Sequence, residues 1–360
     1  MPDYQARWNK ARRLAAEAGV DALYVMSGPN FRWFSGMTPH AGGWPVWSMG
    51  VLIPVAAEPA MQITQMHADL LDLQACPVKN VVVYMDGQDP VPSLRRLFDS
   101  AGLSKGTIGV EDGLWFGDVE LIQAAAPSIA LKRTQAVFDE LRSVKDPDEI
   151  DLIRRAAHIH DLGYAAAQRA IRKGGTVGRA GLDIMAAMVD AGAENMQISG
   201  SFINLSDRRF KSGDVIDVDL WPGSFGGYRA DSARNVFVGE PSDEAVRLYE
   251  LTRHAYRAAV AAVRPGVAAE DVHRACQAVI EEGGRKQVWK VGHGVGLNNG
   301  HEAPLLQAGN QRGLEEGMVF TIDPGVFIQR DVPIHIEDTV VVTADGCENL
   351  NAFTHELVIV

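Results

Sequence analysis

The chain has 360 residues, which is long for one compact core and favours two domains. Its formal net charge is −12 and no stretch is strongly basic, so nucleic acid and anionic membranes are poor partners. The three cysteines form no CxxC pair, which argues against a disulfide scaffold and a cysteine-based zinc site. The sparse cysteines fit a reducing cytosol, so we expect a cytoplasmic protein. We find no secretory signal and no run of about 18 apolar residues.

The first part of the chain alternates helical and strand patterns, which is typical of an α/β domain. A helical period runs through ARWNKARRLAAEAGV and ends at Gly19, and the apolar segment DALYVMSG then predicts a buried strand. Further predicted strands are WSMGVLIPV, AMQITQM, VVVYM and GTIGVED, and further predicted helices lie around residues 91–101 and 118–125.

A long helix is predicted to open the second part of the chain. Asp146 is a good N-cap, Pro147 fits the first helical position, and Glu149 completes a capping box. Apolar residues recur at helical spacing up to the glycine pair that begins at Gly174, where we expect the helix to end. Beyond this point the pattern changes to helix pairs followed by strands.

The second part also contains an internal repeat. The segment IRKGGTVGRAGLDIMAAMVDAG resembles VRPGVAAEDVHRACQAVIEEGG, and KSGDVIDVDL resembles EEGMVFTIDPG. In the latter pair an aspartate follows a glycine by six residues, and a second acid comes after each strand. Several matches in the same order predict two related halves that face each other.

Acidic residues lie in segments that otherwise predict buried strands. Strand alternation places Ile216 and Val218 on one face, with Asp217 and Asp219 on the other. The acids on such strands are Asp217, Asp219, Asp323 and Glu337. Isolated buried carboxylates are too costly to stay ionised without a cation. Because few arginines or lysines are near, hard divalent metal ions are the better explanation.

A nitrogen ligand is available in the glycine-rich segment VGHGVGLNNGHEAP, which contains His293 and His301. Either histidine alone would more often be structural. Together with four acids on strands, they favour a metal centre.

These motifs resemble those of the pita-bread metallohydrolases, which include methionine aminopeptidase, aminopeptidase P, prolidase and creatinase. The resemblance covers nearly the whole chain and begins with GVDALYVMSGPNFRWFSGM. The motifs that follow, in family order, are ELRSVKDPDEIDLIRRAA, GDVIDVDL, DSARNVFVGEPSDE, GHGVGL, HEAP, GMVFTIDPGVF and IEDTVVVT. The resemblance implies an α/β creatinase-type N-terminal domain at residues 1–140. It also implies an α+β pita-bread catalytic domain with a pseudo-twofold repeat at residues 141–360.

The resemblance further implies a set of metal ligands, which are Asp219, Asp231, His293, Asp323 and Glu337. Asp231 and Glu337 would bridge two divalent ions of manganese, cobalt or zinc. Asp323 stands where the family usually has glutamate and would also act as the general base. His301 would donate a hydrogen bond to the tetrahedral oxyanion. Asp217, outside the usual ligand set, is expected to have a structural or supporting role.

Some positions depart from the family pattern. Trp289 replaces a usual histidine four residues before His293, and His335 replaces an arginine two residues before Glu337. Leu305 stands where prolidase-like members often have an arginine, and a further family histidine is missing before the first aspartate. The ligand set is therefore retained while its surroundings change, and Trp289 and His335 are predicted to bind substrate.

The resemblance favours a peptidase that cleaves Xaa-Pro bonds in small peptides, of the aminopeptidase P or prolidase type, through a metal-bridging hydroxide. The alternative is a creatinase-like hydrolase or lyase of a small non-peptide substrate, and a non-catalytic binding protein is a third interpretation. A homodimer is expected from the relatives of this branch. Trp44 and Trp47 would then either help to close a neighbouring subunit's site or pack under their own domain.

Overall fold

A computed structural model describes residues 2–38, 47–172, 174–194, 198–202, 204–221, 223–287, 289–298, 300–329 and 332–360. The chain divides into two compact units, Met1–Arg142 and Ser143–Val360. The boundary predicted from the sequence lies between residues 140 and 141. Over the described ranges, no helix is long and apolar enough to cross a membrane.

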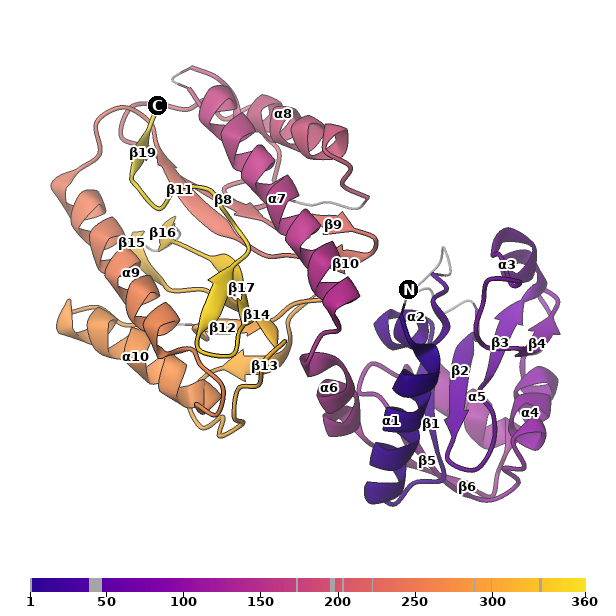
Figure 1. The fold of residues 1–360 in the computed structure, drawn as a ribbon. Helices are drawn as coiled ribbons and strands as arrows, with labels where there is room; N and C mark the ends of the chain where they lie inside the picture. The colour runs from indigo at the N-terminus through magenta and orange to yellow at the C-terminus, as the bar shows by residue number, and fades with distance from the viewer. Residues whose placement is uncertain are drawn as a thin grey trace. The chain divides into compact units, whose positions relative to one another are not determined.

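The first unit is built around a six-stranded sheet with the order β4-β3-β2-β1-β5-β6 (Figure 1). The strands are β1 (Ala22–Met26), β2 (Gly50–Pro54), β3 (Ala60–Thr64), β4 (Asn80–Tyr84), β5 (Gly106–Val110) and β6 (Ile129–Arg133). The helices are α1 (Tyr4–Glu17), α2 (Pro29–Ser35), α3 (Gln65–Leu70), α4 (Val91–Ser100), α5 (Phe116–Ala125) and α6 (Gln135–Ser143). Strand β2 is antiparallel to both of its neighbours, whereas the other pairings are parallel, so five strands share one direction.

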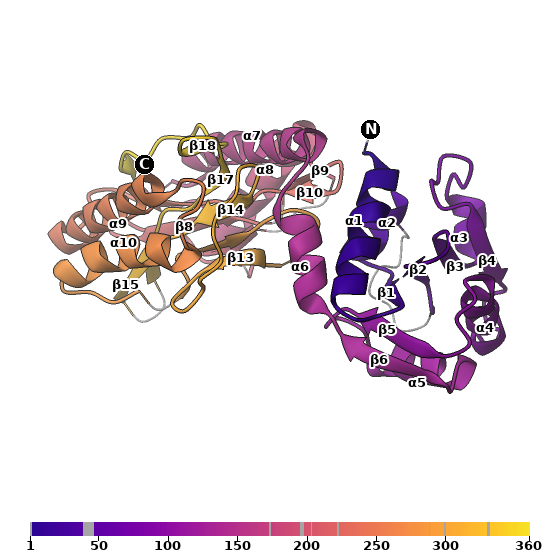
Figure 2. The ribbon, with the colours of Figure 1, turned by 60° about the horizontal axis from the view of Figure 1, so that its bottom comes forward.

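The second unit contains two larger sheets, with the orders β19-β11-β8-β7 and β13-β12-β14-β17-β18 (Figure 2). Its helices are α7 (Pro147–Ala170), α8 (Val177–Asp190), α9 (Asp243–Ala262) and α10 (Ala269–Glu282). Strands of the first half are β7 (Ile198–Gly200), β8 (Val215–Leu220), β9 (Ser224–Phe225), β10 (Tyr228–Arg229) and β11 (Ala233–Phe237). The remaining strands are β12 (Gly292–Gly294), β13 (Glu302–Leu306), β14 (Val319–Ile322), β15 (Gly325–Gln329), β16 (Val332–His335), β17 (Asp338–Val342), β18 (Cys347–Asn349) and β19 (Val358–Ile359).

Each half of the second unit packs a helix pair on its sheet. Ile159 of α7 and Ile184 of α8 share one apolar core with Val218 of β8. In the other half, Leu248 of α9 packs in a core with Phe320 of β14. The predicted combination of an α/β N-terminal domain with an α+β pita-bread domain is therefore confirmed.

The two halves meet at a short antiparallel bridge between Ala233 and Glu337. The Ala233 amide donates to the Glu337 carbonyl over 3.1 Å, and the Glu337 amide donates to the Ala233 carbonyl over 3.0 Å. The antiparallel strand pairs β8–β11 and β14–β17 both carry acids beside this bridge. The bridge therefore brings together acidic residues that lie about a hundred positions apart in the sequence.

The start of α7 agrees with the sequence, since Asp146 and Glu149 form the predicted capping box. The helix ends earlier than predicted, at Ala170, with Ile171 in an extended conformation. Trp44 lies outside the described residues. The Trp47 indole donates a hydrogen bond to Asp86 Oδ1 over 2.7 Å, within its own unit.

Candidate metal centre

The five predicted ligands lie around one cavity of about 450 Å³ in the second unit. They are Asp219 near the end of β8, Asp231 between β10 and β11, His293 in β12, Asp323 after β14 and Glu337 between β16 and β17. All are buried except Asp219, which is half-buried. The described residues that line the cavity are Ser199, Asp219, Trp221, Asp231, His293, Gly300, His301, Asp323, His335 and Glu337.

The described residues offer three potential ligand groups, and two of these groups share Glu337. Asp219, Asp231 and Glu337 make one group, and His293, Asp323 and Glu337 make the other, with ligand atoms within 4.8 Å of one another in each. His293 Nε2 lies 3.4 Å from Glu337 Oε1 and 3.6 Å from Asp231 Oδ2. One carboxylate common to two ligand groups suits a pair of neighbouring metal ions.

The charges of the site fit divalent cations. Asp231 Oδ1 and Glu337 Oε1 are buried without a hydrogen-bond partner. Burial, followed by repulsion from neighbouring carboxylates, raises the pKa of Asp219, Asp231 and Glu337 well above the ordinary values. No lysine or arginine is among the described residues that line the cavity. Hard divalent ions would compensate this concentration of carboxylate groups.

The GHG motif orients His293 toward the acids. The ring's Nδ1 lies 3.1 Å from the Gly294 carbonyl oxygen, so a proton on Nδ1 leaves the Nε2 lone pair free. Burial lowers the pKa of His293 to about 4, which keeps the ring neutral at pH 7. A Cβ on Gly292 would lie 2.0 Å from the Thr321 carbonyl oxygen, and one on Gly294 would lie 2.2 Å from that of Ala303. Both glycines are therefore required because neighbouring backbone passes so close.

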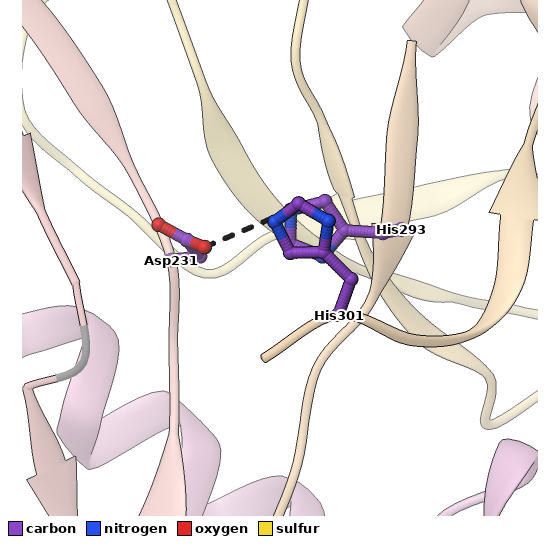
Figure 3. Close-up of side chains that lie close together, drawn as sticks. All are labelled: Asp231, His293 and His301. Atoms are coloured by element: carbon purple, nitrogen blue, oxygen red, sulfur yellow. Dashed lines mark ion pairs between the residues drawn. The ribbon is translucent and has the colours of Figure 1, made fainter. Parts of the chain in front are cut away.

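His301 stacks on His293 (Figure 3), with ring centroids 3.6 Å apart and an interplanar angle of 14°. Its ring also forms a potential ligand group with His293 and Asp231. Burial, followed by the His293 ring, lowers the pKa of His301 to about 4, so the side chain is a neutral donor at pH 7. This geometry allows His301 either to donate a hydrogen bond to substrate or to bind metal directly.

Asp323 is fixed by several donors. Trp289 Nε1 lies 3.0 Å from both Asp323 Oδ1 and the Asp323 carbonyl oxygen, and Gln287 Nε2 donates to the same carbonyl over 3.2 Å. His335 Nε2 lies 2.5 Å from Oδ1. Both predicted substrate-binding residues thus contact Asp323, but Trp289 is not among the described residues of the cavity wall, whereas His335 is.

Asp217 supports His335 from the other side. The Asp217 carboxylate is buried, and its Oδ1 lies 3.6 Å from His335 Nδ1. Burial lowers the pKa of His335, but the Asp323 and Asp217 carboxylates outweigh burial and hold that pKa well above its ordinary value. The imidazolium therefore lies between two carboxylates, one of which belongs to the predicted ligand set.

Comparison with known proteins agrees with this geometry. Residues 151–344 match metallopeptidase family M24, and residues 7–144 match the creatinase/prolidase N-terminal domain. The first match alone spans more than half of the chain. The chain belongs to metallopeptidase family M24. It is therefore a peptidase, and the resemblance seen in its sequence motifs is confirmed.

The relatives of this M24 peptidase match it along nearly its full length. The probable dipeptidase PepE of Mycobacterium tuberculosis is 31% identical over 370 residues, covering 97% of this chain and 96% of the relative. The Xaa-Pro dipeptidase of Pyrococcus furiosus is 27% identical over 363 residues, covering 98% of this chain and 99% of the relative. Among solved structures, a recombinant prolidase from Thermococcus sibiricus is 25% identical with a TM-score of 0.90, and both chains are covered completely, at 100% each.

Sequence patterns missed part of the cavity wall of this M24 peptidase, namely Ser199, Trp221 and Gly300. Trp221 follows Asp219 by two residues, so strand alternation would have placed it on the same face. Ser199 lies in β7, where the backbone pairing places it opposite Asp219. No sequence signal in a short, polar strand indicated that pairing.

Proposed function

We propose that this M24 peptidase hydrolyses Xaa-Pro bonds in small peptides, with two divalent ions bound by the five predicted ligands. The observation that carries the proposal is the pair of ligand groups that share Glu337 at one cavity. The substrate preference is supported by relatives named Xaa-Pro dipeptidase that match almost the whole chain.

The five predicted ligands would hold two divalent ions, and these would supply a Lewis acid for the peptide carbonyl and a water nucleophile of lowered pKa. The protein supplies the rest of the chemistry. Trp289 and His335 both contact Asp323 Oδ1 and so position this carboxylate, which would accept the proton of the water. His301, neutral at pH 7, donates its N–H to the oxygen of the tetrahedral intermediate.

The proposal is tested by removing metal with a chelator and reloading the protein separately with manganese, cobalt or zinc. Each form would be assayed on Ala-Pro, Ala-Pro-Ala and Ala-Ala. We expect metal-dependent cleavage of the two proline substrates and little cleavage of Ala-Ala. Equal rates on all three peptides would contradict the preference for proline, and activity that persists in the chelated protein would contradict the role of metal.

A second candidate function is hydrolysis of a small non-peptide substrate, as creatinase performs on the same fold. It is favoured by one feature of the cavity, because no described wall residue is a lysine or arginine that could bind the free carboxylate of a dipeptide. Including creatine in the substrate panel separates the two candidates. Cleavage of Ala-Pro-Ala with little cleavage of Ala-Pro would instead indicate an aminopeptidase. The C-terminal carboxylate of such a longer substrate lies further from the scissile bond and needs no basic residue in this cavity.

The identity of the metal and the homodimer remain predictions. The metal form with the highest turnover in the same assay identifies the preferred ion. Sedimentation equilibrium of the full chain gives its mass in solution, and a mass of 39.0 kDa would correspond to a monomer and contradict the dimer.

A further inference from the structure

A second cavity, of about 490 Å³, lies entirely within the first unit, away from the predicted metal ligands. Its wall combines Trp115 and Asp118, which follow β5, with Pro90, which follows β4, and Ser48, which precedes β2. Since β2 is antiparallel to β1 and Met26 pairs with Gly50, the start of β2 lies at the carboxyl end of β1. The cavity is therefore at the carboxyl edge of the parallel strands.

This edge is where open α/β sheets bind ligands, at the point where the strand order changes direction. Here the order changes at β1, which has β2 on one side and β5 on the other (Figure 1). The connections that follow β4 and β5 and the segment that precedes β2 all contribute to the wall. The position of the cavity in the fold is one observation, and the polar groups within it are another.

Two polar side chains in the wall lack partners within the described ranges. Asp118 is 9% exposed and its carboxylate makes no hydrogen bond or ion pair, while Ser48 Oγ is buried without a hydrogen-bond partner. Burial alone raises the pKa of Asp118 to about 6. A carboxylate in this environment is stabilised by a cation, and none of the wall residues that the structure describes is a lysine or arginine.

The rest of the wall is mostly apolar. Trp115 and Leu121 lie on the same segment as Asp118, and Pro90 is on the adjacent loop. An indole ring attracts organic cations through its face, and apolar side chains accommodate an alkyl group. Glu120 adds a second acid to the wall.

We propose that this cavity binds a small organic ammonium ion, with the ammonium group at Asp118 and Ser48 and the alkyl part against Trp115 and Leu121. A free amine fits better than an amino acid, because no basic side chain of the described wall would bind the carboxylate of a zwitterion. The site does not depend on the peptidase function, since none of its residues belongs to the second unit.

Isothermal titration calorimetry on the full chain tests the proposal with n-butylammonium as the probe. We expect saturable binding of n-butylammonium and at least tenfold weaker binding of n-butanol, n-butyrate and alanine. Saturable n-butanol binding of equal strength would overturn the role of the charge. Alanine binding as tight as that of n-butylammonium would overturn the class of ligand.

Variants place the binding in this cavity rather than at the acids of the metal centre. Asp118→Asn should weaken n-butylammonium binding by about tenfold or more, because an ionic hydrogen bond is replaced by a neutral one. Asp99→Asn, which changes an exposed aspartate on α4 of the same unit, should leave binding unchanged. Equal affinities of the two variants would overturn the proposal.

Ala124→Lys provides a second variant that does not disturb a buried position. Ala124 is exposed and lies in the wall, so a lysine there introduces a competing cation at the cavity rim. We expect it to weaken n-butylammonium binding while the circular dichroism spectrum and the midpoint of thermal unfolding stay as in the parent. Unchanged binding in this variant would overturn the location.

Discussion

His335 Nε2 lies 2.5 Å from Asp323 Oδ1, the same oxygen that accepts a hydrogen bond from Trp289 Nε1 over 3.0 Å. Aspartate at position 323 is one methylene shorter than the glutamate that the pita-bread metallohydrolases usually have at this position. Two donors on one oxygen restrain the orientation of this shorter carboxylate. Outer partners of this kind orient metal ligands and tune their basicity.

Replacing His335 should therefore weaken metal binding even if His335 itself does not bind metal. We expect His335→Asn to lower metal affinity by about 10- to 100-fold, the usual cost of losing an outer hydrogen bond to a ligand. Calorimetric titration of the chelated protein with Mn²⁺ measures the effect. His158→Asn, at an exposed position on α7, is the matched control and should bind Mn²⁺ like the parent. An unchanged Mn²⁺ affinity in His335→Asn would show that His335 does not position Asp323.

His301 provides the second prediction, because its ring stacks on His293 and belongs to the same potential ligand group. If His301 donates to the oxyanion, His301→Ala should keep the full metal content and lose about 10²–10³ in turnover. Elemental analysis and turnover would be measured on the same preparation. A parallel loss of metal would make His301 a ligand, and an unchanged rate would exclude both roles.

The glycines beside His293 give a prediction about stability. A Cβ at Gly292 would meet the Thr321 carbonyl oxygen at 2.0 Å, and backbone cannot move aside as a flexible side chain can. Gly292→Ala should lower the free energy of unfolding by about 1–3 kcal/mol or more, as overpacked cores do. Urea denaturation compares it with Gly313→Ala, where the nearest atom to a new Cβ is 3.9 Å away. Similar unfolding midpoints for the two variants would contradict the close approach.

Metal removal should destabilise the second unit. Without cations, the buried carboxylates of Asp231 and Glu337 have oxygens with no hydrogen-bond partner. A ligand that binds only the folded state raises its stability in proportion to the logarithm of its concentration. The thermal midpoint should therefore rise with increasing Mn²⁺ in the parent and rise less in Asp231→Asn. Equal rises in both proteins would place the stabilising ion elsewhere.

Much of the second unit could be predicted because its signals are local. The capping box at Asp146 and Glu149 marks the start of α7, and strand alternation at Asp219 separates the acids from the apolar core. The pairing of Ala233 with Glu337, which brings the halves together, is not encoded in either strand alone. Only the internal repeat indicated that the two acidic hairpins would face each other.

The surroundings of Asp323 were harder to predict from local patterns. Contact of Trp289 with substrate stays a prediction, and its indole also donates hydrogen bonds to Asp323 in the segment after β14. The position of the indole depends on Gly325, where a Cβ would lie 2.1 Å from the Trp289 ring. The partners of His335 likewise come from separate strands, so a single-sequence pattern gives no sign that Asp217 lies on its other side. The end of α7 at Ala170 rather than at the later glycine pair is a smaller difference, at a helix terminus.

The central claim is a dinuclear metal centre in which Asp231 and Glu337 both contribute to two ion sites. The most direct measurement is the number of Mn²⁺ ions bound per chain at saturation, determined by equilibrium dialysis and elemental analysis of the chelated and reloaded protein. We expect two ions per chain in the parent and in Asp99→Asn, and fewer than two in Asp231→Asn. Binding of one ion or none by the parent, or two ions by Asp231→Asn with unchanged affinity, would contradict the claim.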